Sequence, residues 1–233
     1  MLKKIIVTGG DGRFASELKK FKTSYKFFFR TKKQLNVLSV NSIKKNLNKF
    51  KPDAVLHLAG LSRPMSIHNK NINQSIDLNI IGTANLVKAC NNKKIKIILI
   101  STSYLYPGKK GNYKEDDPLL PWNNYGWSKL GAESSVQMYN NSLIIRACMT
   151  ERPFTHKKAF TNVKCNFIFH DEFIKIFLKI LKLKGIINIG GKAQTIYQFA
   201  KKYNKNIKKN KSRGELPNNI FMSLKKLENL LKR

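Results

Sequence analysis

Hydrophobic and polar residues alternate along the first two-thirds of the chain in a pattern that predicts strands separated by helices. The run Lys3–Gly9 (KKIIVTG) is short, apolar and β-branched and stops at a glycine, which predicts a buried strand. Similar runs predict strands at Tyr25–Phe29, Ala54–Leu58, Ile95–Ser101 and Leu143–Arg146. Apolar residues at helical spacing predict helices at Arg13–Lys20, Ser42–Phe50, Ile76–Cys90 and Tyr125–Tyr139. This order is typical of an α/β fold with a doubly wound parallel sheet.

The pattern loosens after Arg146. It still predicts a helix at Asp171–Leu183, a strand at Ile186–Ile189, a helix at Thr195–Tyr203 and a terminal helix at Leu224–Leu231. We therefore expect a first domain over residues 1–147 and a small C-terminal lobe over residues 148–233 that is not fully independent.

The net charge of +32 is the strongest compositional signal. Nearly all of it comes from lysine, with only seven arginines among the 45 cationic residues, and the lysines are spread along the whole chain. Recognition of nucleic acid favours arginine and a focused basic surface, so we expect no nucleic-acid partner. A diffuse positive field would still attract anionic small molecules.

No apolar run reaches the roughly 18 residues of a membrane span, and the apolar stretch near the N-terminus is too short for a signal peptide. These features predict a cytoplasmic protein without a membrane partner. Cys90, Cys148 and Cys165 are odd in number and far apart, and no cluster has metal-ligand spacing. Reduced thiols and the absence of a metal site are the expectation.

A glycine-rich turn, Thr8–Ala15 (TGGDGRFA), follows the first predicted strand and opens a helix. Glycines there allow a tight turn and let a pyrophosphate approach backbone N–H groups, which predicts a dinucleotide site in a Rossmann-type domain. The second predicted strand ends at Phe29-Arg30 without an acidic residue that could bind a free ribose 2′-hydroxyl. NADP(H) is therefore favoured, and NAD(H) stays open.

Two further motifs carry candidate chemistry. Tyr125 and Lys129 lie four residues apart and share one face of a predicted helix. An ammonium near a phenol favours the phenolate, so this tyrosine could exchange a proton with a carbonyl or an alcohol. Ser101–Tyr106 (STSYLY) ends the fourth predicted strand, where Thr102 could bind a substrate oxygen; a Ser/Thr turn that merely ends the strand is the alternative.

Together these segments resemble the extended short-chain dehydrogenase/reductases of the NAD-dependent epimerase/dehydratase superfamily. The resemblance rests on five ordered motifs, which are TGGDGRFA, His57–Gly60 (HLAG), Asn79–Leu86 (NIIGTANL), STSYLY and Tyr125–Glu133 (YGWSKLGAE). Within that family, Ser101–Gly108 and Tyr113–Glu133 look most similar to dTDP-4-dehydrorhamnose reductases and related sugar-nucleotide-binding proteins.

The resemblance implies a reductase of a 4-keto group on a nucleotide-linked deoxysugar. It implies the catalytic set Thr102, Tyr125 and Lys129, with Ser103 and Tyr104 at the substrate. The residues that it places around the cofactor are Gly9, Gly12, Arg13, Phe14, Arg30, Asn36, Leu58, Ala59, Gly60, Tyr125 and Lys129.

Two positions depart from the family pattern. Ala15 replaces a third glycine, and Ser103 stands where the reductases usually carry aspartate.

An epimerase would use the same residues, whereas a dehydratase would need an acidic pair beside Thr102 and is disfavoured. A catalytically silent dinucleotide-binding regulatory subunit is the alternative from another class, although such relatives usually lose the tyrosine or the lysine. The sequence also leaves a homodimer open.

Overall fold

The computed structural model describes residues 2–232. These residues form two compact units, each discontinuous in sequence. The first unit extends to Ser101 and includes Asn123–Ile145 and Ile180–Ile186. The second unit comprises Thr102–Trp122, Arg146–Lys179 and the chain from Ile187 onward.

A six-stranded sheet with the order β10-β5-β4-β3-β1-β2 confirms the predicted α/β fold. Its strands are β1 (Lys4–Thr8), β2 (Lys26–Arg30), β3 (Ala54–His57), β4 (Lys96–Thr102), β5 (Ser142–Ala147) and β10 (Gly185–Ile189). β1 pairs in parallel with β2 and β3, and β3 pairs in parallel with β4. The chain order changes direction between β1 and β3, and the carboxyl ends of parallel strands at such a point are the usual place for a ligand.

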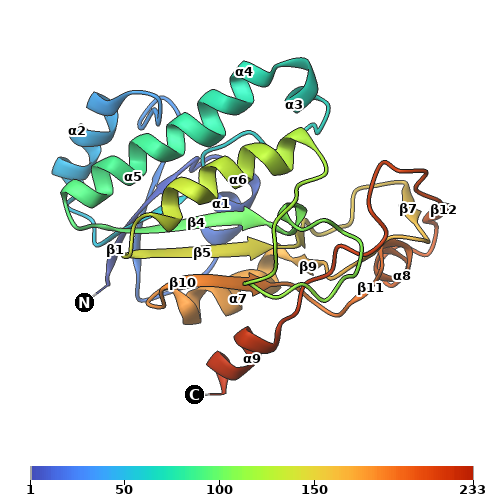
Figure 1. Cartoon of the computed structure of the whole chain (residues 1–233). Coiled ribbons are helices and arrows are strands. Elements are labelled where there is room, and N and C mark those ends of the chain that lie inside the picture. The colour runs from blue at the N-terminus through green and yellow to red at the C-terminus, as the bar shows by residue number, and fades with distance from the viewer. Residues whose placement is uncertain (1, 233) are drawn as a thin grey trace. The chain divides into compact units, whose positions relative to one another are not determined.

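The core of the first unit lies between this sheet and three helices. These are α2 (Val40–Phe50), α5 (Gly82–Asn92) and α6 (Asn124–Gln137), which lie along one face of the sheet (Figure 1). Leu47, Leu86 and Val136, one from each helix, join a buried cluster with strand residues such as Ile6 and Val55. The apolar faces of these helices thus pack against the sheet, as the spacing of apolar residues in the sequence predicts.

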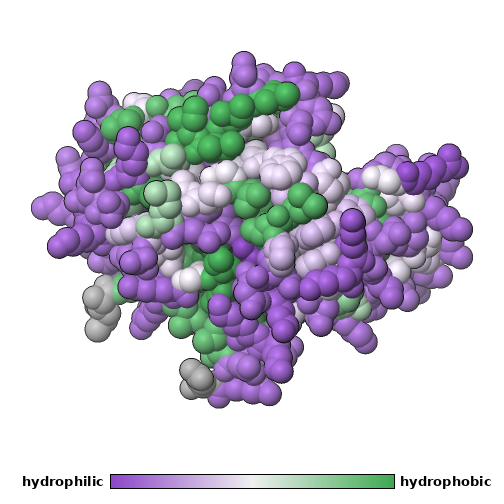
Figure 2. All heavy atoms as spheres, in the orientation of Figure 1, coloured by the Kyte–Doolittle hydropathy of each residue, from purple (hydrophilic) through white to green (hydrophobic). Residues whose placement is uncertain are grey.

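The helix predicted at Ile76–Cys90 begins earlier and is interrupted. It comprises α4 (Ile72–Ser75), a π-helical segment η1 (Ile76–Ile81) and α5, and Figure 1 shows them as one continuous rod. Ile72 and Ile76 of this rod are exposed. Figure 2 shows apolar surface in the region where the rod lies. A short helix that the sequence did not predict, α3 (Ile67–Lys70), precedes this rod. No helix of residues 2–232 is long and apolar enough to cross a membrane.

The second unit is built from short elements around a separate aromatic core. Its helical elements are η2 (Ser103–Leu105), α7 (His170–Ile180, whose last residue belongs to the first unit), α8 (Ile196–Lys201) and α9 (Lys225–Leu231). Two-residue and three-residue strands pair as β6 with β9, β7 with β12 and β8 with β11. They are β6 (Met149–Thr150), β7 (Lys158–Phe160), β8 (Lys164–Cys165), β9 (Ile168–Phe169), β11 (Gln194–Thr195) and β12 (Lys208–Asn210). The sequence predicted none of these strands, because runs this short carry no periodicity.

Candidate functional site

The glycine turn after β1 packs closely against the end of β2 and the loop after β3. Gly9 has a φ of +64°, and a Cβ there would lie 2.8 Å from the backbone nitrogen of Ala59. The Gly10 N–H donates to the Arg30 carbonyl at 2.8 Å, and a Cβ on Gly10 would lie 2.7 Å from the Arg30 nitrogen. Only glycine fits at both positions. Gly10 was missed as a site residue, although the double glycine in TGGDG was the available signal.

Helix α1 (Arg13–Leu18) starts directly after this turn. Its N-cap is Gly12, whose N–H donates to the Gly9 carbonyl at 3.0 Å. Gly12 and Arg13 are exposed, whereas the side chains of Phe14 and Ala15 are buried. A contact from Phe14 to a ligand would therefore come from its peptide group. Ala15 is fully buried, so its small side chain allows the helix to pack closely.

Arg30 ends β2, and its guanidinium lies over the Phe50 ring, with Cζ 4.9 Å from the ring centroid. Its Nε is buried and has no hydrogen-bond partner among residues 2–232. A buried donor without an acceptor is costly, so this group is suited to an anionic ligand. The Asn36 side-chain oxygen accepts from the Leu38 N–H at 3.0 Å, which fixes the orientation of this amide.

A buried polar network, which we call the first polar core, joins the ends of β1 and β3 to α5. The Thr8 hydroxyl accepts from the N–H groups of Leu58 and Ala59 at 3.1 Å each, so its hydrogen points to His57 Nδ1 at 2.9 Å. Thr83 donates its hydroxyl to the Asn79 carbonyl and therefore accepts from His57 Nε2 at 2.9 Å. These bonds fix the neutral tautomer with hydrogen on Nε2.

Burial is the main reason that the pKa of His57 falls to about 3, and the charge of Lys129 lowers it further. His57 therefore stays neutral at physiological pH. The sequence placed His57 inside a family motif but gave it no role, and the hydrogen bonds supply one. Its Nδ1 accepts from the Thr8 hydroxyl and so orients that hydroxyl, which holds the loop Leu58–Ala59 against the end of β1.

Asn79, in the π-helical segment, extends the first polar core to α6. Its side chain accepts from the Leu61 N–H at 2.7 Å and donates to the Leu61 carbonyl at 2.9 Å and to Ser128 Oγ at 2.8 Å. Ser128 in turn donates to the Tyr125 carbonyl at 2.8 Å. Gly60 is needed beside this amide, because a Cβ there would lie 2.9 Å from Asn79 Oδ1. The loop after β3 is thus tied to the helix that carries Tyr125.

Tyr125 and Lys129 lie one turn apart near the start of α6, whose N-cap Asn123 accepts from the Gly126 N–H at 2.8 Å. Lys129 Nζ donates to the Ile100 carbonyl near the end of β4 at 2.8 Å. Desolvation lowers the pKa of Lys129 to about 8, although Glu133 opposes this shift. The lysine that the sequence singled out is thus half-buried and held at the carboxyl end of the sheet.

The other predicted residues belong to the second unit. Thr102 ends β4, and its hydroxyl accepts from the Tyr104 N–H at 3.3 Å. Ser103 is buried near the Cys148 thiol. The Tyr104 ring lies 4.9 Å from the ring of Trp122. The structure therefore places Thr102, Ser103 and Tyr104 in one segment of this unit.

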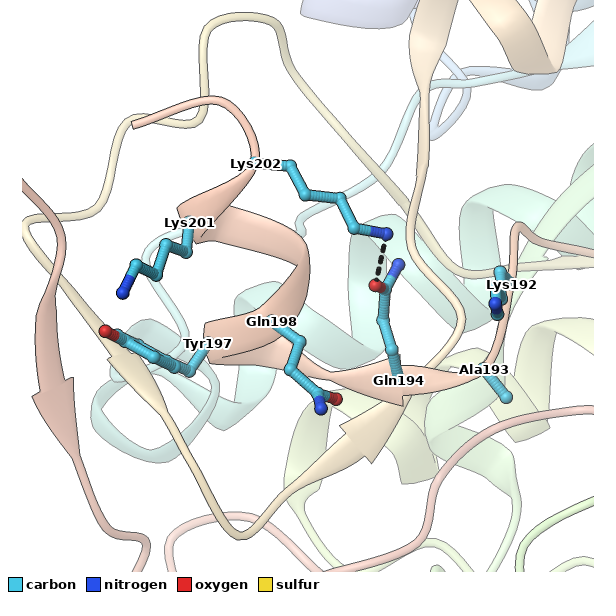
Figure 3. A pocket seen from close by; sticks show the side chains of 7 residues that line it. All are labelled: Lys192, Ala193, Gln194, Tyr197, Gln198, Lys201 and Lys202. Atoms are coloured by element: carbon cyan, nitrogen blue, oxygen red, sulfur yellow. Dashed lines mark hydrogen bonds between the residues drawn. The ribbon is translucent and has the colours of Figure 1, made fainter. Parts of the chain in front are cut away.

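A surface hollow of about 540 Å³ lies beside α8 in the second unit. Figure 3 shows its lining, in which Lys202 Nζ donates to Gln194 Oε1 at 2.7 Å. None of the sequence-predicted site residues lines this hollow. Among residues 2–232, no group of three or more metal-ligating side chains comes together.

Comparison with curated proteins gives relatives of two kinds. The chain is 32% identical over 107 residues to methionine adenosyltransferase 2 subunit beta of Xenopus tropicalis. The aligned residues cover 46% of this chain and 31% of that protein. It is 31% identical over 147 residues to the spore coat polysaccharide biosynthesis protein SpsK of Bacillus subtilis, covering 61% of this chain and 52% of that one. The chain thus spans about a third to a half of the length of these relatives.

Comparison with solved structures supports the fold. A dTDP-4-dehydrorhamnose reductase from Bacillus anthracis in complex with NADP matches with a TM-score of 0.88 and 18% identity, over 99% of this chain and 92% of that one. The corresponding protein of Clostridium acetobutylicum matches with a TM-score of 0.82 and 21% identity, over 99% and 100%. UDP-glucose 4-epimerase from Thermus thermophilus in complex with NAD matches with a TM-score of 0.78 and 16% identity, over 99% and 93%.

The family model described as the RmlD substrate binding domain matches residues 3–154, which hold the glycine turn, the first polar core and the Tyr125–Lys129 pair. This match confirms the resemblance inferred from the five motifs. The chain belongs to the RmlD substrate binding domain family.

Proposed function

We propose that this protein is an NADPH-dependent reductase that converts the 4-keto group of a nucleotide-linked deoxysugar to an alcohol. The observation that carries the proposal is the placement of Lys129. Its ammonium is half-buried, bonded to the Ile100 carbonyl at the carboxyl end of the sheet and one helical turn from Tyr125. This arrangement supports proton exchange by the phenol.

The residues at the ends of β1, β2 and β3 fit a dinucleotide. Gly9 and Gly10 leave no room for a side chain, the turn leads into α1, and Arg30 Nε is a buried donor without an acceptor among residues 2–232. Gly9, Gly12 and the peptide groups of Arg13 and Phe14 would hold the pyrophosphate. Arg30 and Asn36 would lie near the adenosine, and Leu58, Ala59 and Gly60 would form the floor. When bound, the dinucleotide supplies the hydride.

Tyr125 donates its phenolic proton to the carbonyl oxygen as that oxygen becomes an alkoxide. The ammonium of Lys129 stabilises the phenolate that remains and holds the nicotinamide ribose. Thr102 would bind the same keto oxygen and orient it, while Ser103 and Tyr104 would contact the sugar.

NADP(H) is the proposed cofactor, and NAD(H) remains the alternative. Arg30 supports a 2′-phosphate, and the similar Bacillus anthracis reductase is in complex with NADP. The Thermus thermophilus epimerase is instead in complex with NAD. An epimerase would use the same phenol and lysine, so the sugar products must be compared directly.

A catalytically silent regulatory subunit is the second candidate function. It is favoured by the similarity to methionine adenosyltransferase 2 subunit beta from several vertebrates. The retention of both Tyr125 and Lys129 supports the enzyme.

The deciding experiment combines binding and turnover. Purified protein is screened by thermal shift with NADPH, NADH and a panel of nucleotide sugars, since a ligand that binds the folded state raises its melting temperature. Reduction of dTDP-4-keto-6-deoxy sugars is then followed by the loss of NADPH absorbance. Tyr125→Phe should lower kcat by at least about 100-fold while NADPH affinity stays unchanged. Full activity in that variant would refute the mechanism, and NADPH binding without any turnover would favour the regulatory subunit.

A further inference from the structure

His68 is a buried imidazole that the proposed reaction does not use. It lies in α3 and is 1% exposed, although residues 62–66, which precede α3, are all exposed. Its ring centroid lies 5.1 Å from that of Tyr125, with the two planes tilted by 55°. Both residues belong to the first unit, so the contact is part of one compact body.

Two further contacts brace this histidine. Its Nδ1 lies 2.8 Å from Ser75 Oγ, at the end of α4. Its backbone carbonyl accepts from the side-chain amide of Asn124 at 3.4 Å, and Asn124 is the residue just before Tyr125. The start of α6 is thus supported by α3 at two points, once through the backbone and once through the imidazole ring.

The imidazole is neutral in this position. Burial lowers the pKa of His68, and the backbone carbonyl of Ser62 partly opposes the shift. Its Nε2 is buried and makes no hydrogen bond to a group of residues 2–232. The ring therefore acts on Tyr125 through packing, and Ser75 fixes how the ring is turned.

We propose that His68 is a positioning residue for Tyr125, whose imidazole, anchored by Ser75, holds the phenol ring in the orientation needed for proton transfer. This inference rests on the proposed reductase function, because it assigns His68 to the same proton-transfer step. Orientation matters because a displacement of about 1 Å at a reacting group can cost on the order of 100-fold in rate.

The kinetic test compares His68→Ala, His68→Phe and Ser75→Ala with the parent protein, using NADPH and a dTDP-4-keto-6-deoxy sugar. His68→Ala should lower kcat by about 10–100-fold, with the Kd for NADPH unchanged within about two-fold. His68→Phe keeps a flat ring against the phenol and should recover most of the loss. Ser75→Ala removes only the anchor and should cost less than His68→Ala.

Two kinetic outcomes would overturn the proposal. One is a folded His68→Ala variant with kcat within about two-fold of the parent. The other is a His68→Phe variant as impaired as His68→Ala, since the nitrogen atoms rather than the ring would then matter. A parallel loss of melting temperature and NADPH affinity in His68→Ala would likewise reject positioning in favour of a merely structural role.

A spectroscopic test does not depend on turnover. The chain has four histidines, so their ring Cε1–H signals can be resolved by NMR and the His68 signal assigned from its loss in His68→Ala. Tyr125→Leu removes an aromatic ring and should shift the His68 signal while the other three stay in place. An unchanged His68 signal would show that the two rings do not meet in solution. If the parent protein reduces no sugar nucleotide, the proposed function fails, and this measurement still decides the contact.

Discussion

Each unit of the molecule contains a buried polar network, and the two are built from different chemistry. The first polar core consists of neutral groups, namely hydroxyls, an amide and the imidazole of His57. In the second unit, Arg146 is 2% exposed and donates to the Tyr106 hydroxyl at 2.8 Å and to the Glu115 carbonyl at 2.9 Å. We call this the second polar core.

The groups that each core satisfies show what it is for. The first core binds the backbone of loops at the carboxyl ends of β1 and β3, where the glycine turn lies. The second core binds the backbone of the Tyr113–Glu115 segment, with Asn188 Nδ2 donating to the Tyr113 carbonyl at 3.0 Å and Asn188 Oδ1 accepting from Tyr106. Substitutions in the first polar core should therefore alter dinucleotide affinity, and substitutions in the second polar core should mainly lower the free energy of unfolding.

The largest effect is expected for Arg146→Met. This change leaves the Tyr106 hydroxyl and the Glu115 carbonyl without a donor in the interior, which should lower the free energy of unfolding by about 2–4 kcal/mol. Urea unfolding measures this difference. Arg213→Met, at an exposed arginine of the same unit, is the control and should stay within about 0.5 kcal/mol.

NADPH affinity of Arg146→Met, measured where the variant is still folded, should equal that of the parent protein. A weaker affinity at unchanged stability would reverse the roles assigned to the two polar cores.

His57 gives the first polar core a distinct dependence on pH. Its folded-state pKa of about 3 lies below the ordinary histidine pKa of 6.5, so below pH 6.5 the unfolded chain binds a proton that the folded protein does not. Stability from this group is complete above pH 6.5 and falls by up to about 1.4 kcal/mol per pH unit as the pH drops toward 3, or about 2 kcal/mol by pH 5.

His57→Phe should remove this slope, so that its deficit in unfolding free energy shrinks as the pH falls. At pH 7 that deficit should be about 1–3 kcal/mol, because Thr8 and Thr83 lose their partner. His156→Gln, at an exposed histidine, should keep the parent slope. Identical slopes for the parent and His57→Phe would show that His57 is not the group that titrates.

The two units also differ in how much of them the sequence predicts. Strands such as Ile95–Ser101 were predicted within a few residues, because long β-branched runs and glycine stops act locally. The Tyr125–Lys129 pair was found because its spacing of four residues is a helical signal. Gly9 was found because a glycine-rich turn between a strand and a helix is also a local signal. The sequence did not show that Gly9 packs closely against the backbone of Ala59.

The remaining features depend on contacts between residues distant in sequence. Nothing near His68 in the chain announces a contact with Tyr125, 57 residues away, and Asn188 meets the Tyr113 carbonyl across 75 residues. The α8 helix ends two residues earlier than predicted, at Lys201, because periodicity alone fixes no terminus. Single-sequence patterns therefore locate chemistry within an element but not the partners that hold it.

Asn79→Ala tests whether the first polar core serves the ligand edge of the sheet. It removes the bonds to Leu61 and Ser128 and should cost about 1–2 kcal/mol in unfolding free energy. NADPH affinity should fall several-fold as well, because the loop after β3 is no longer fixed. Asn85→Ala is matched on the same helical rod, where Asn85 donates to the Val37 carbonyl at 3.2 Å. Equal NADPH affinities for these two variants would show that the first polar core does not contribute to NADPH binding.

Arg30→Ala makes the smallest expected change in stability and the most selective change in binding. Arg30 ends β2, and its guanidinium stacks on the ring of Phe50, which ends α2. Its buried Nε has no acceptor among residues 2–232. Removing it should weaken NADPH by about ten-fold, the loss of roughly 1.4 kcal/mol from one charge-assisted contact, and NADH by less than about two-fold. Isothermal titration with both cofactors measures the difference, with Lys33→Ala as the exposed cationic control. Equal losses for NADPH and NADH would mean that Arg30 does not bind the 2′-phosphate. The dinucleotide would then be bound through the glycine turn and the loops of the first unit, which contact parts that NADPH and NADH share.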